Sequence, residues 1–368
     1  MKGMGDEYIA YAYWLDNVQG IGKKKKIQWV LKGLAPKEIY DQIEMIPETK
    51  ITRQEKAKIL EAKNRWNVWK QYENMVQKEI YFVPYILEAY PQRLREISAP
   101  PFGIYVKGKL PGEGKKSVAI VGARHCSEYG RKMTTEYARA FAECGIPVIS
   151  GMASGIDSVA QRAALEAKGS TYAVLGCGVD ICYPRENFAL YMEMTQKGGI
   201  ISEYPPGMRP LPQHFPARNR IISALADTVL IMEAKIKSGS LITAEMALEQ
   251  GKDIYALPGA CTDILSEGCN RLISDGAGIL ISPKELLETM GISNVKNVRK
   301  QTENEIKLES AEKLVYSCLG LHPKSLEQIL DNTKMSLPEL LSHLISLEMK
   351  GCIKEISKNY YVKIDLEY

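Results

Sequence analysis

The stretch Val118-Ala-Ile-Val-Gly-Ala-Arg-His-Cys-Ser-Glu-Tyr-Gly130 decides the fold class of this chain. Four apolar residues lead into a turn of small residues. Residues 129–144 then carry apolar side chains at helical spacing, with Gly145 as a stop. This order of strand, tight turn and helix is typical of a nucleotide-binding α/β domain. Arg124, however, stands where a dinucleotide-binding fold has its second glycine, so the turn fits the pyrophosphate of NAD poorly.

The same pattern recurs through residues 102–290. Further strand candidates are IPVISG, TYAVLG, GGIISE, DTVLIME, DIYALPG and AGILI, with helical stretches between them. Strands that are apolar throughout and alternate with helices predict a parallel sheet with helices on both faces. Ligands of such sheets bind beyond the carboxyl ends of the strands.

The regions on either side of this pattern differ from it in composition and in the spacing of their apolar residues. Residues 1–97 have apolar and aromatic side chains at helical spacing, which predicts an N-terminal helical domain that ends before Ser98-Ala-Pro-Pro101. Residues 291–308 are polar and charged, as in a linker. Residues 309–368 contain three short helical patterns and a closing hairpin, which predict a winged-helix-like domain.

Composition excludes several classes of protein. The net charge is +4, and residues 1–80 hold the whole excess, with 15 Lys and Arg against 11 Asp and Glu. No apolar run approaches the roughly 20 residues that span a bilayer, and the N-terminus lacks a signal-peptide pattern, so we expect a cytoplasmic protein without membrane association. The eight cysteines form no CxxC pair and there are only four histidines, so no metal site is expected.

Small residues follow four of the predicted strands. The turns are Gly122-Ala-Arg124, Ser150-Gly-Met-Ala-Ser-Gly-Ile-Asp157, Gly176-Cys-Gly-Val-Asp180 and Ser238-Gly-Ser240. Glycine lets backbone N–H groups approach a phosphate, and helix N-termini add partial positive charge. Any one of these turns could be only a tight connection, but four at one sheet edge predict anion binding. Neither GxGxxG nor a Walker sequence occurs, so no nucleotide cofactor is expected.

A second signal is the segment His214-Phe-Pro-Ala-Arg-Asn-Arg-Ile-Ile222. An aromatic ring can stack on a base while arginines hold the backbone phosphates, a combination typical of proteins that bind single-stranded nucleic acid. The alternative is an ordinary helix start with Pro216 in its first turn.

A catalytic constellation is not apparent. Cys126 and Cys177 lie in turns, and only by chance of folding would His125 or His214 pair with either of them. Four carboxylates lie near strand ends, and we expect them to cap helices or orient arginines rather than act as acids or bases: Asp157, Asp180, Glu203 and Glu233. No catalytic residue is therefore assigned.

Together these segments resemble the DNA-processing protein A family (DprA, also called Smf). The matching motifs are GARHCSEYG, SGMASGID, AVLGCGVDICYP, SEYPPG, FPARNRII, KSGSLITAEMA, ALPG and EGCNRLISDGA, in the family's order from about residue 118 to 281. The resemblance implies an extended Rossmann-like core between an N-terminal helical domain, of sterile-alpha-motif (SAM) or helix-hairpin-helix type, and a C-terminal winged helix. It also implies a protein of natural transformation that binds single-stranded DNA, loads the recombinase RecA onto it, and forms a homodimer.

The resemblance assigns the DNA contacts residue by residue. Arg124 and Arg185 fall at basic contacts of the family, and Phe215 is the base-stacking residue. The remaining positions match the FPxRN segment or line the same pocket: Arg218, Asn219, Arg220, Ser150, Gly151, Gly176, Gly178, Ser238 and Gly239. Two departures concern Gln161, where many members have histidine, and Pro212, where some have lysine.

Three alternatives stay open. The turn Gly20-Ile-Gly22 with Lys23–Lys26 is either a helix-hairpin-helix contact for DNA or a packing module with a solvated lysine run. The tail is either a duplex-DNA reader or, as we expect from its acidic residues, a protein contact. The segment Ser238–Glu245 distantly echoes nucleotide phosphoribohydrolases, so a nucleotide hydrolase is the alternative function.

Overall fold

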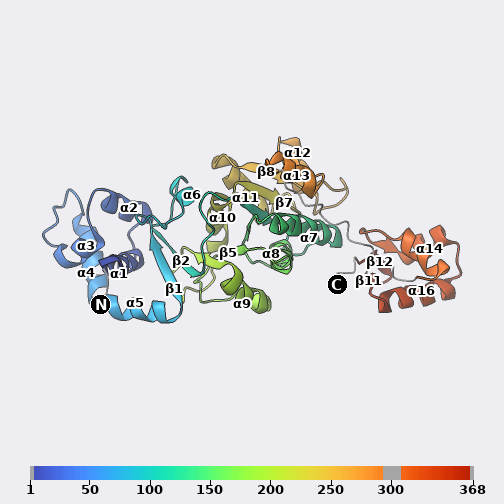
Figure 1. The fold of residues 1–368 in the computed structure, drawn as a ribbon, viewed down its shortest axis with the longest axis horizontal. Coiled ribbons are helices and arrows are strands. Elements are labelled where there is room, and N and C mark those ends of the chain that lie inside the picture. Colours follow the sequence, from blue (N-terminus) through green and yellow to red (C-terminus); the bar gives the residue numbers. More distant parts are fainter. Residues whose placement is uncertain (1–3, 293–307, 365–368) are drawn as a thin grey trace.

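The computed structural model describes residues 4–292 and 308–364. In Figure 1 a group of helices lies at one end, a large sheet with its helices in the middle, and a small helical domain at the other end. The expected class is confirmed: an extended, mostly parallel sheet is combined with an N-terminal helical region and a C-terminal winged helix. Most of the predicted linker lies outside the described residues.

The N-terminal region packs around buried aromatic residues. Its helices are α1 (Met4–Asn17), α2 (Lys23–Leu31), α3 (Pro36–Gln42), α4 (Arg53–Arg65) and α5 (Val68–Gln77). Trp14 and Trp29 are almost completely buried at its centre. Lys26 is buried too, and its ammonium donates to the carbonyls of Asp16 and Val18. Burial lowers the pKa of Lys26 to about 8, so this lysine belongs to the packed interior and not to a solvated run.

The sheet begins earlier than the sequence pattern indicates. Strand β1 (Ile80–Pro84) pairs antiparallel with β2 (Gly103–Gly108), and β2 pairs antiparallel with β6 (Gly199–Ser202). Residues 80–84 therefore form a strand inside the range 1–97 that was expected to be helical. The division of the chain into domains stays a prediction.

The seven strands predicted between residues 102 and 290 all occur. They are β3 (Val118–Val121), β4 (Val148–Ser150), β5 (Thr171–Leu175), β6 (Gly199–Ser202), β7 (Thr228–Ile231), β8 (Asp253–Ala256) and β9 (Gly278–Ile279). The nine-stranded sheet has the order β1-β2-β6-β5-β4-β3-β7-β8-β9, and every pair from β6 to β9 is parallel. The chain winds outward from β3 to β6 and then returns to place β7 on the other side of β3. The crevice beyond the carboxyl ends of β3 and β7 is thus the switch point at which α/β sheets bind ligands.

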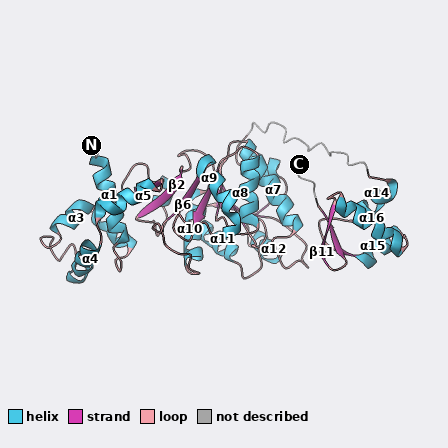
Figure 2. Cartoon of the chain, turned by 90° about the horizontal axis from the view of Figure 1, so that it is seen from below, coloured by secondary structure: helices cyan, strands magenta, loops and turns pink. Residues whose placement is uncertain are grey.

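Helices cover both faces of the sheet, because successive strand residues point to opposite sides. Val118 and Ile120 pack with one set of helices, and Ala119 and Val121 with the other. In Figure 2 the upper side carries α7 (Glu128–Glu143), α8 (Ile156–Glu166) and α9 (Phe188–Lys197). The lower side carries α10 (His214–Leu225), α11 (Gly239–Glu249) and α12 (Glu267–Ser274). Two short helices complete the cover: α6 (Gln92–Arg95) and α13 (Pro283–Thr289).

The C-terminal domain has its own small core. It contains α14 (Ser310–Cys318), β10 (Lys324–Ser325), α15 (Leu326–Thr333), α16 (Leu337–Met349), β11 (Ile353–Ser357) and β12 (Tyr360–Lys363). Val315, Ile329 and Leu344 are buried between the helices and the sheet. None of the described helices combines the length and the apolar character that a membrane span requires.

A buried carboxylate joins the N-terminal helices to the sheet domain. Glu203, 5% exposed, accepts from Lys23 of α2 at 3.1 Å and from both terminal nitrogens of Arg220 of α10 at 2.7 and 2.8 Å. Burial raises the pKa of Glu203, but the charges and hydrogen bonds of Lys23 and Arg220 outweigh it, so the pKa lies below its ordinary 4.5.

Replacing Glu203 by glutamine is expected to lower the free energy of unfolding at neutral pH by about 1–2 kcal/mol, because two cations lose their anionic partner. The stabilisation by a carboxylate with a depressed pKa is present above its unfolded-state value and is lost as pH falls through its folded-state value. The difference between wild type and Glu203→Gln in urea unfolding should therefore shrink below about pH 4.5. A difference that stays constant from pH 7 to pH 3 would contradict this assignment.

Candidate nucleic-acid interface

A pocket of about 800 Å³ opens at the switch point of the sheet. The loops after β3, β4, β5, β7 and β8, one face of α10 and the N-terminal part of α11 form its walls. Its lining residues are Val121, Gly122, Ala123, Arg124, His125, Ala153, Asp157, Tyr183, Pro212, Phe215, Pro216, Arg218, Asn219, Ile222, Lys235, Lys237, Ser238, Gly239, Ser240, Thr243, Ile264 and Leu265. We call this the switch-point pocket.

An arginine and an aromatic ring face each other in this pocket. The guanidinium carbon of Arg124 lies 5.8 Å from the centroid of the Phe215 ring, within cation–π range. The Tyr183 ring centroid lies 5.5 Å from that of Phe215, and the two rings are tilted by 38° to each other. A Cβ atom at Gly176 would approach the Phe215 ring to 3.1 Å, so a glycine there lets the ring lie close to the strand end. Phe215 is half-buried and Arg124 is exposed, so the ring is held in place while the charge of Arg124 reaches solvent.

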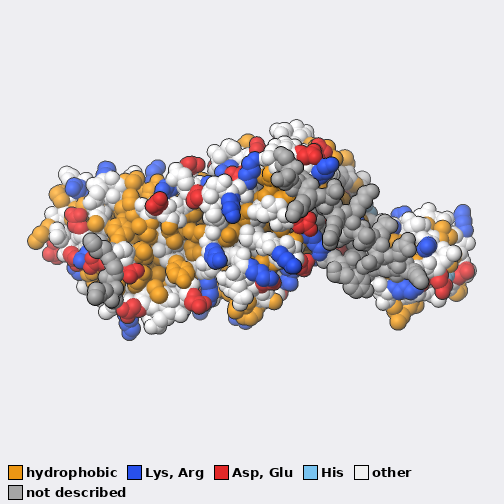
Figure 3. Space-filling view, viewed as in Figure 1, with side chains coloured by type: hydrophobic (Ala, Val, Ile, Leu, Met, Phe, Trp, Pro, Cys, Tyr) orange, Lys and Arg blue, Asp and Glu red, His pale blue; other side chains and the backbone are white. Residues whose placement is uncertain are grey.

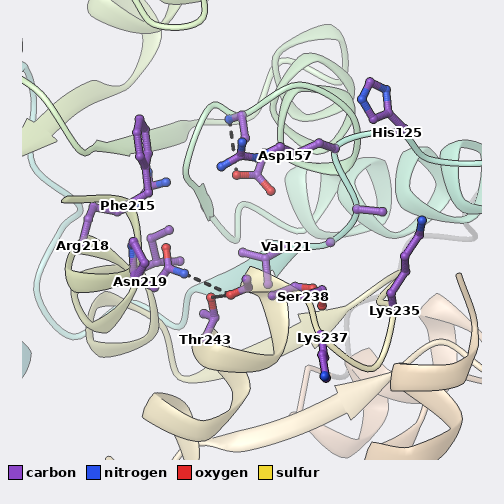
Figure 4. Close-up of a pocket in the computed structure, with 18 of the residues that line it drawn as sticks. Val121, His125, Asp157, Phe215, Arg218, Asn219, Lys235, Lys237, Ser238 and Thr243 are labelled. Carbon is purple, nitrogen blue, oxygen red and sulfur yellow. Dashed lines mark hydrogen bonds between the residues drawn. The ribbon is translucent and has the colours of Figure 1, made fainter. Parts of the chain in front are cut away.

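Two lysines border the pocket opposite the ring. Figure 4 shows Phe215 and Asn219 on one side and His125, Lys235 and Lys237 on the other. Lys235 and Lys237 are exposed and follow β7 closely. In the part of the chain that the structure describes, Arg124, Lys235 and Lys237 form no ion pair. Their charges are therefore available to an anionic ligand.

The start of α11 forms the floor between these two sides. Ser238 precedes the helix, and its hydroxyl lies 2.8 Å from that of Ser240. The Asn219 amide donates to the carbonyl of Gly239 at 3.2 Å, which ties α10 to α11. The first backbone N–H groups of a helix have no intrahelical partner and attract anions.

Arg218 is an interior residue, although it borders the pocket. Only 4% of it is exposed, and its guanidinium donates to the carbonyls of Gly151, at 2.9 Å, and Val174. A Cβ atom at Gly151 would lie 2.6 Å from this guanidinium, so only glycine leaves room for it. Burial lowers the pKa of Arg218 to about 10, while the charge of Asp157 acts in the opposite direction. Arg218 thus joins α10 to the ends of β4 and β5. Its buried positive charge also makes the electrostatic potential of the pocket more positive.

The loops after β3 and β4 are locked together by close backbone approach. Gly155 precedes α8 with a φ of +77°, and a Cβ atom there would lie 2.3 Å from the carbonyl oxygen of Ala123. The amide of Ile156 donates to that same carbonyl at 3.1 Å. This contact fixes the loop that carries Arg124.

The four carboxylates near strand ends all have partners within the protein. Asp157 accepts hydrogen bonds from the backbone amides of Gly151 and Ala153, and Glu233 accepts from the hydroxyl and the amide of Ser127. Asp180 accepts from the amide of Gly207 and forms an ion pair with Lys78. Glu203 pairs with Lys23 and Arg220, as described above. Burial raises the pKa values of Asp157 and Glu233 above their ordinary range. Burial also raises the pKa of Cys177 to about 12, which keeps this thiol protonated. Glu203 therefore orients an arginine, whereas Asp157, Asp180 and Glu233 accept hydrogen bonds from the loops.

Six of the twelve predicted DNA contacts line the switch-point pocket: Arg124, Phe215, Arg218, Asn219, Ser238 and Gly239. The structure places the other six outside its lining: Ser150, Gly151, Gly176, Gly178, Arg185 and Arg220. Ser150 is buried and donates to the carbonyl of Ile120, and Arg220 is held by Glu203 and by the carbonyl of Ala99. Gly178 packs against Pro205 and Asp180, and Arg185 is exposed beyond the pocket.

Lys235 and Lys237 were not among the predicted DNA contacts. The available signal was their position: both lie between the end of a predicted strand and the small-residue turn Ser238-Gly-Ser240, where the side chains border the same edge as the other turns. Tyr183 was also missed, and only the fold brings it against Phe215.

Family models match two parts of the chain. Residues 82–291 match the model described as DNA recombination-mediator protein A, and residues 299–357 match the DprA winged helix domain. The first match contains every wall of the switch-point pocket.

Individual relatives agree with these matches. The chain is 32% identical to Protein Smf of Synechocystis, over 81% of this chain and 84% of the relative. The X-ray structure of DNA processing protein A from Streptococcus pneumoniae superposes with a TM-score of 0.66 at 34% identity, covering 78% of this chain and 98% of that one. DNA processing protein A from Helicobacter pylori, whose structure concerns a single-stranded DNA binding mode, gives a TM-score of 0.52 at 32% identity, covering 58% and 95% of the two chains.

Proposed function

The chain belongs to the DNA recombination-mediator protein A family, DprA or Smf, and we propose that it binds single-stranded DNA in the switch-point pocket. The observation that carries this proposal is the Arg124 guanidinium over the Phe215 ring, opposite Lys235 and Lys237. An aromatic platform beside basic groups is the arrangement that holds single strands. The single-stranded DNA binding mode of the Helicobacter pylori relative supports the same ligand.

Each wall of the pocket has one task in this mechanism. Phe215 stacks on a base, which requires an unpaired strand because bases in a duplex already stack on each other. Arg124, Lys235 and Lys237 neutralise the phosphates, and the backbone N–H groups at the start of α11 add hydrogen bonds. These contacts carry little sequence information, so binding is expected to be nearly independent of base sequence.

The biological role that follows is recombination mediation. We propose that the protein protects incoming single-stranded DNA during natural transformation and loads a RecA-type recombinase onto it, acting as a cytoplasmic homodimer. The family relationship supports this role. The separate winged helix, with its own core, is proposed as a protein contact.

The alternative of a nucleotide hydrolase receives no support from the geometry. Glu245, the carboxylate of the Ser238–Glu245 segment, is exposed on α11 and is not one of the residues that line the switch-point pocket. Release of free base from nucleoside monophosphates would nevertheless establish that activity.

The salt dependence of binding tests the role of the two lysines. Replacing Lys235 and Lys237 together by alanine is expected to weaken oligothymidylate binding. The slope of log K against log salt should fall by about 0.7 for each phosphate that the variant no longer neutralises. Fluorescence anisotropy at several salt concentrations measures both quantities. Lys284, an exposed lysine on α13, provides the control, and Lys284→Ala should leave the slope unchanged. Equal slopes for the double variant and wild type would remove these lysines from the site.

A further inference from the structure

A second pocket continues the first one past Arg124. It has a volume of about 450 Å³ and lies between the first turn of α7 and the first two turns of α8. Arg124 and His125 line both pockets, so one loop separates two adjoining hollows. The other walls include Arg131 of α7 and Arg162 of α8. We call it the arginine pocket.

Positive charge dominates the arginine pocket. Three arginines border it, Arg124, Arg131 and Arg162, against one carboxylate, Glu186. Glu186 accepts a hydrogen bond from the hydroxyl of Ser154, and Arg131 forms an ion pair at 3.5 Å with Glu128 of its own helix, which does not line the pocket. Arg162 is exposed and forms no ion pair among the described residues. Figure 3 shows Lys and Arg side chains gathered over α8 and α9 on this face.

The arginine pocket differs from the switch-point pocket in its aromatic residues, and this difference indicates which part of a DNA strand it binds. No Phe, Tyr or Trp of the described chain lines the arginine pocket, and its one aromatic side chain, His125, lies on the wall shared with the switch-point pocket, so the part formed by Arg131 and Arg162 has no aromatic platform of its own. Guanidinium groups form paired hydrogen bonds to phosphate oxygens without contacting the base. The pocket therefore fits a sugar–phosphate backbone, and its shared wall makes it the continuation of a strand already bound at Phe215.

We propose that the arginine pocket is a second binding segment, which takes the phosphodiester backbone of the same single strand after it passes over Arg124. This inference rests on the proposed function, because it extends the strand held in the switch-point pocket. It assigns Arg131 and Arg162 to a longer DNA-binding site, so the affinity should increase with oligonucleotide length beyond what the switch-point pocket alone can hold.

Binding of oligonucleotides of two lengths distinguishes the contribution of the arginine pocket from that of the switch-point pocket. The double variant Arg131→Ala/Arg162→Ala is titrated with a fluorescent thymidine tetranucleotide and with an oligothymidylate of about 20 nucleotides. The tetranucleotide is expected to bind as tightly as to wild type, which also shows that the variant is folded. The longer strand is expected to bind about tenfold more weakly, with a salt slope reduced by about 0.7–1.4. The control Arg271→Ala removes an exposed arginine of α12 that lines neither pocket.

The outcomes separate this inference from the proposed function. If wild type binds both oligonucleotides and the double variant matches it for both, the arginine pocket is not part of the site, while the proposed function stands. If the double variant weakens the tetranucleotide as much as the longer strand, the two arginines do not form a separate segment. If wild type binds neither oligonucleotide, the proposed function itself fails, and this inference fails with it.

Discussion

Replacing Arg218 by methionine is expected to lower the free energy of unfolding by about 3–5 kcal/mol. Methionine keeps much of the length and apolar volume of the side chain but removes the charge. The carbonyls of Gly151 and Val174 would lose their donor, and the buried carboxylate of Asp157 would lose the positive charge that opposes the effect of its burial. Urea unfolding measures the change, and a decrease below about 1 kcal/mol would contradict an interior role for Arg218.

A control variant and a double variant show whether the loss of stability comes from the buried position of Arg218 and its coupling to Asp157. Arg185→Met removes an arginine that is exposed and has no ion pair in the described residues, so it should change stability by no more than about 0.5 kcal/mol. Combining Arg218→Met with Asp157→Asn should cost less than the sum of the two single changes, because the second change removes the uncompensated charge. Additive effects would show that the two side chains are not coupled.

Phe215→Leu is expected to weaken oligothymidylate binding by about 1–3 kcal/mol, the range found for removing the platform of one stacked base. Leucine keeps an apolar side chain next to Gly176 and Tyr183 but offers no flat ring to a base. The Arg124 guanidinium also loses the ring over which it lies. Fluorescence anisotropy at fixed salt measures the affinity.

The matched variant is Phe215→Tyr, which keeps the ring and should bind within a few-fold of wild type. Because stacking is independent of charge, Phe215→Leu should leave the salt slope nearly unchanged, unlike the Lys235/Lys237 double variant. If leucine and tyrosine at position 215 bind equally well, the ring is not a stacking platform.

The segment Phe215–Arg220 shows how far a sequence motif can specify a site. Residues three and four apart in a helix share a face, so Phe215, Arg218 and Asn219 point together, whereas Arg220 is turned away from them. The structure follows this spacing: Arg220 lies against Glu203, outside the switch-point pocket. Helical spacing could therefore have predicted the division of the motif. It could not predict the burial of Arg218, because this depends on Gly151 and Val174, which are distant in sequence.

Some strands could likewise be predicted from the sequence and others could not. The seven strands of the α/β pattern are apolar throughout and alternate with helices, so the sequence predicts them and their parallel pairing. Strand β1 has no such context: residues 80–84 follow five helices, and a short apolar run alone does not distinguish strand from helix. Its antiparallel pairing with β2 depends on tertiary contacts that no local pattern records.

A single-strand site in the switch-point pocket can be tested by the fluorescence anisotropy of a labelled oligothymidylate with wild type and with Arg124→Ala, each challenged with unlabelled duplex. The Arg124 side chain lines the pocket outside the buried framework, so its removal leaves that framework intact. We expect wild type to bind tightly and to resist the duplex, and Arg124→Ala to lose most of this affinity. Equal binding by the two proteins, or displacement of the strand by duplex, would contradict a single-strand site at the switch point of the sheet.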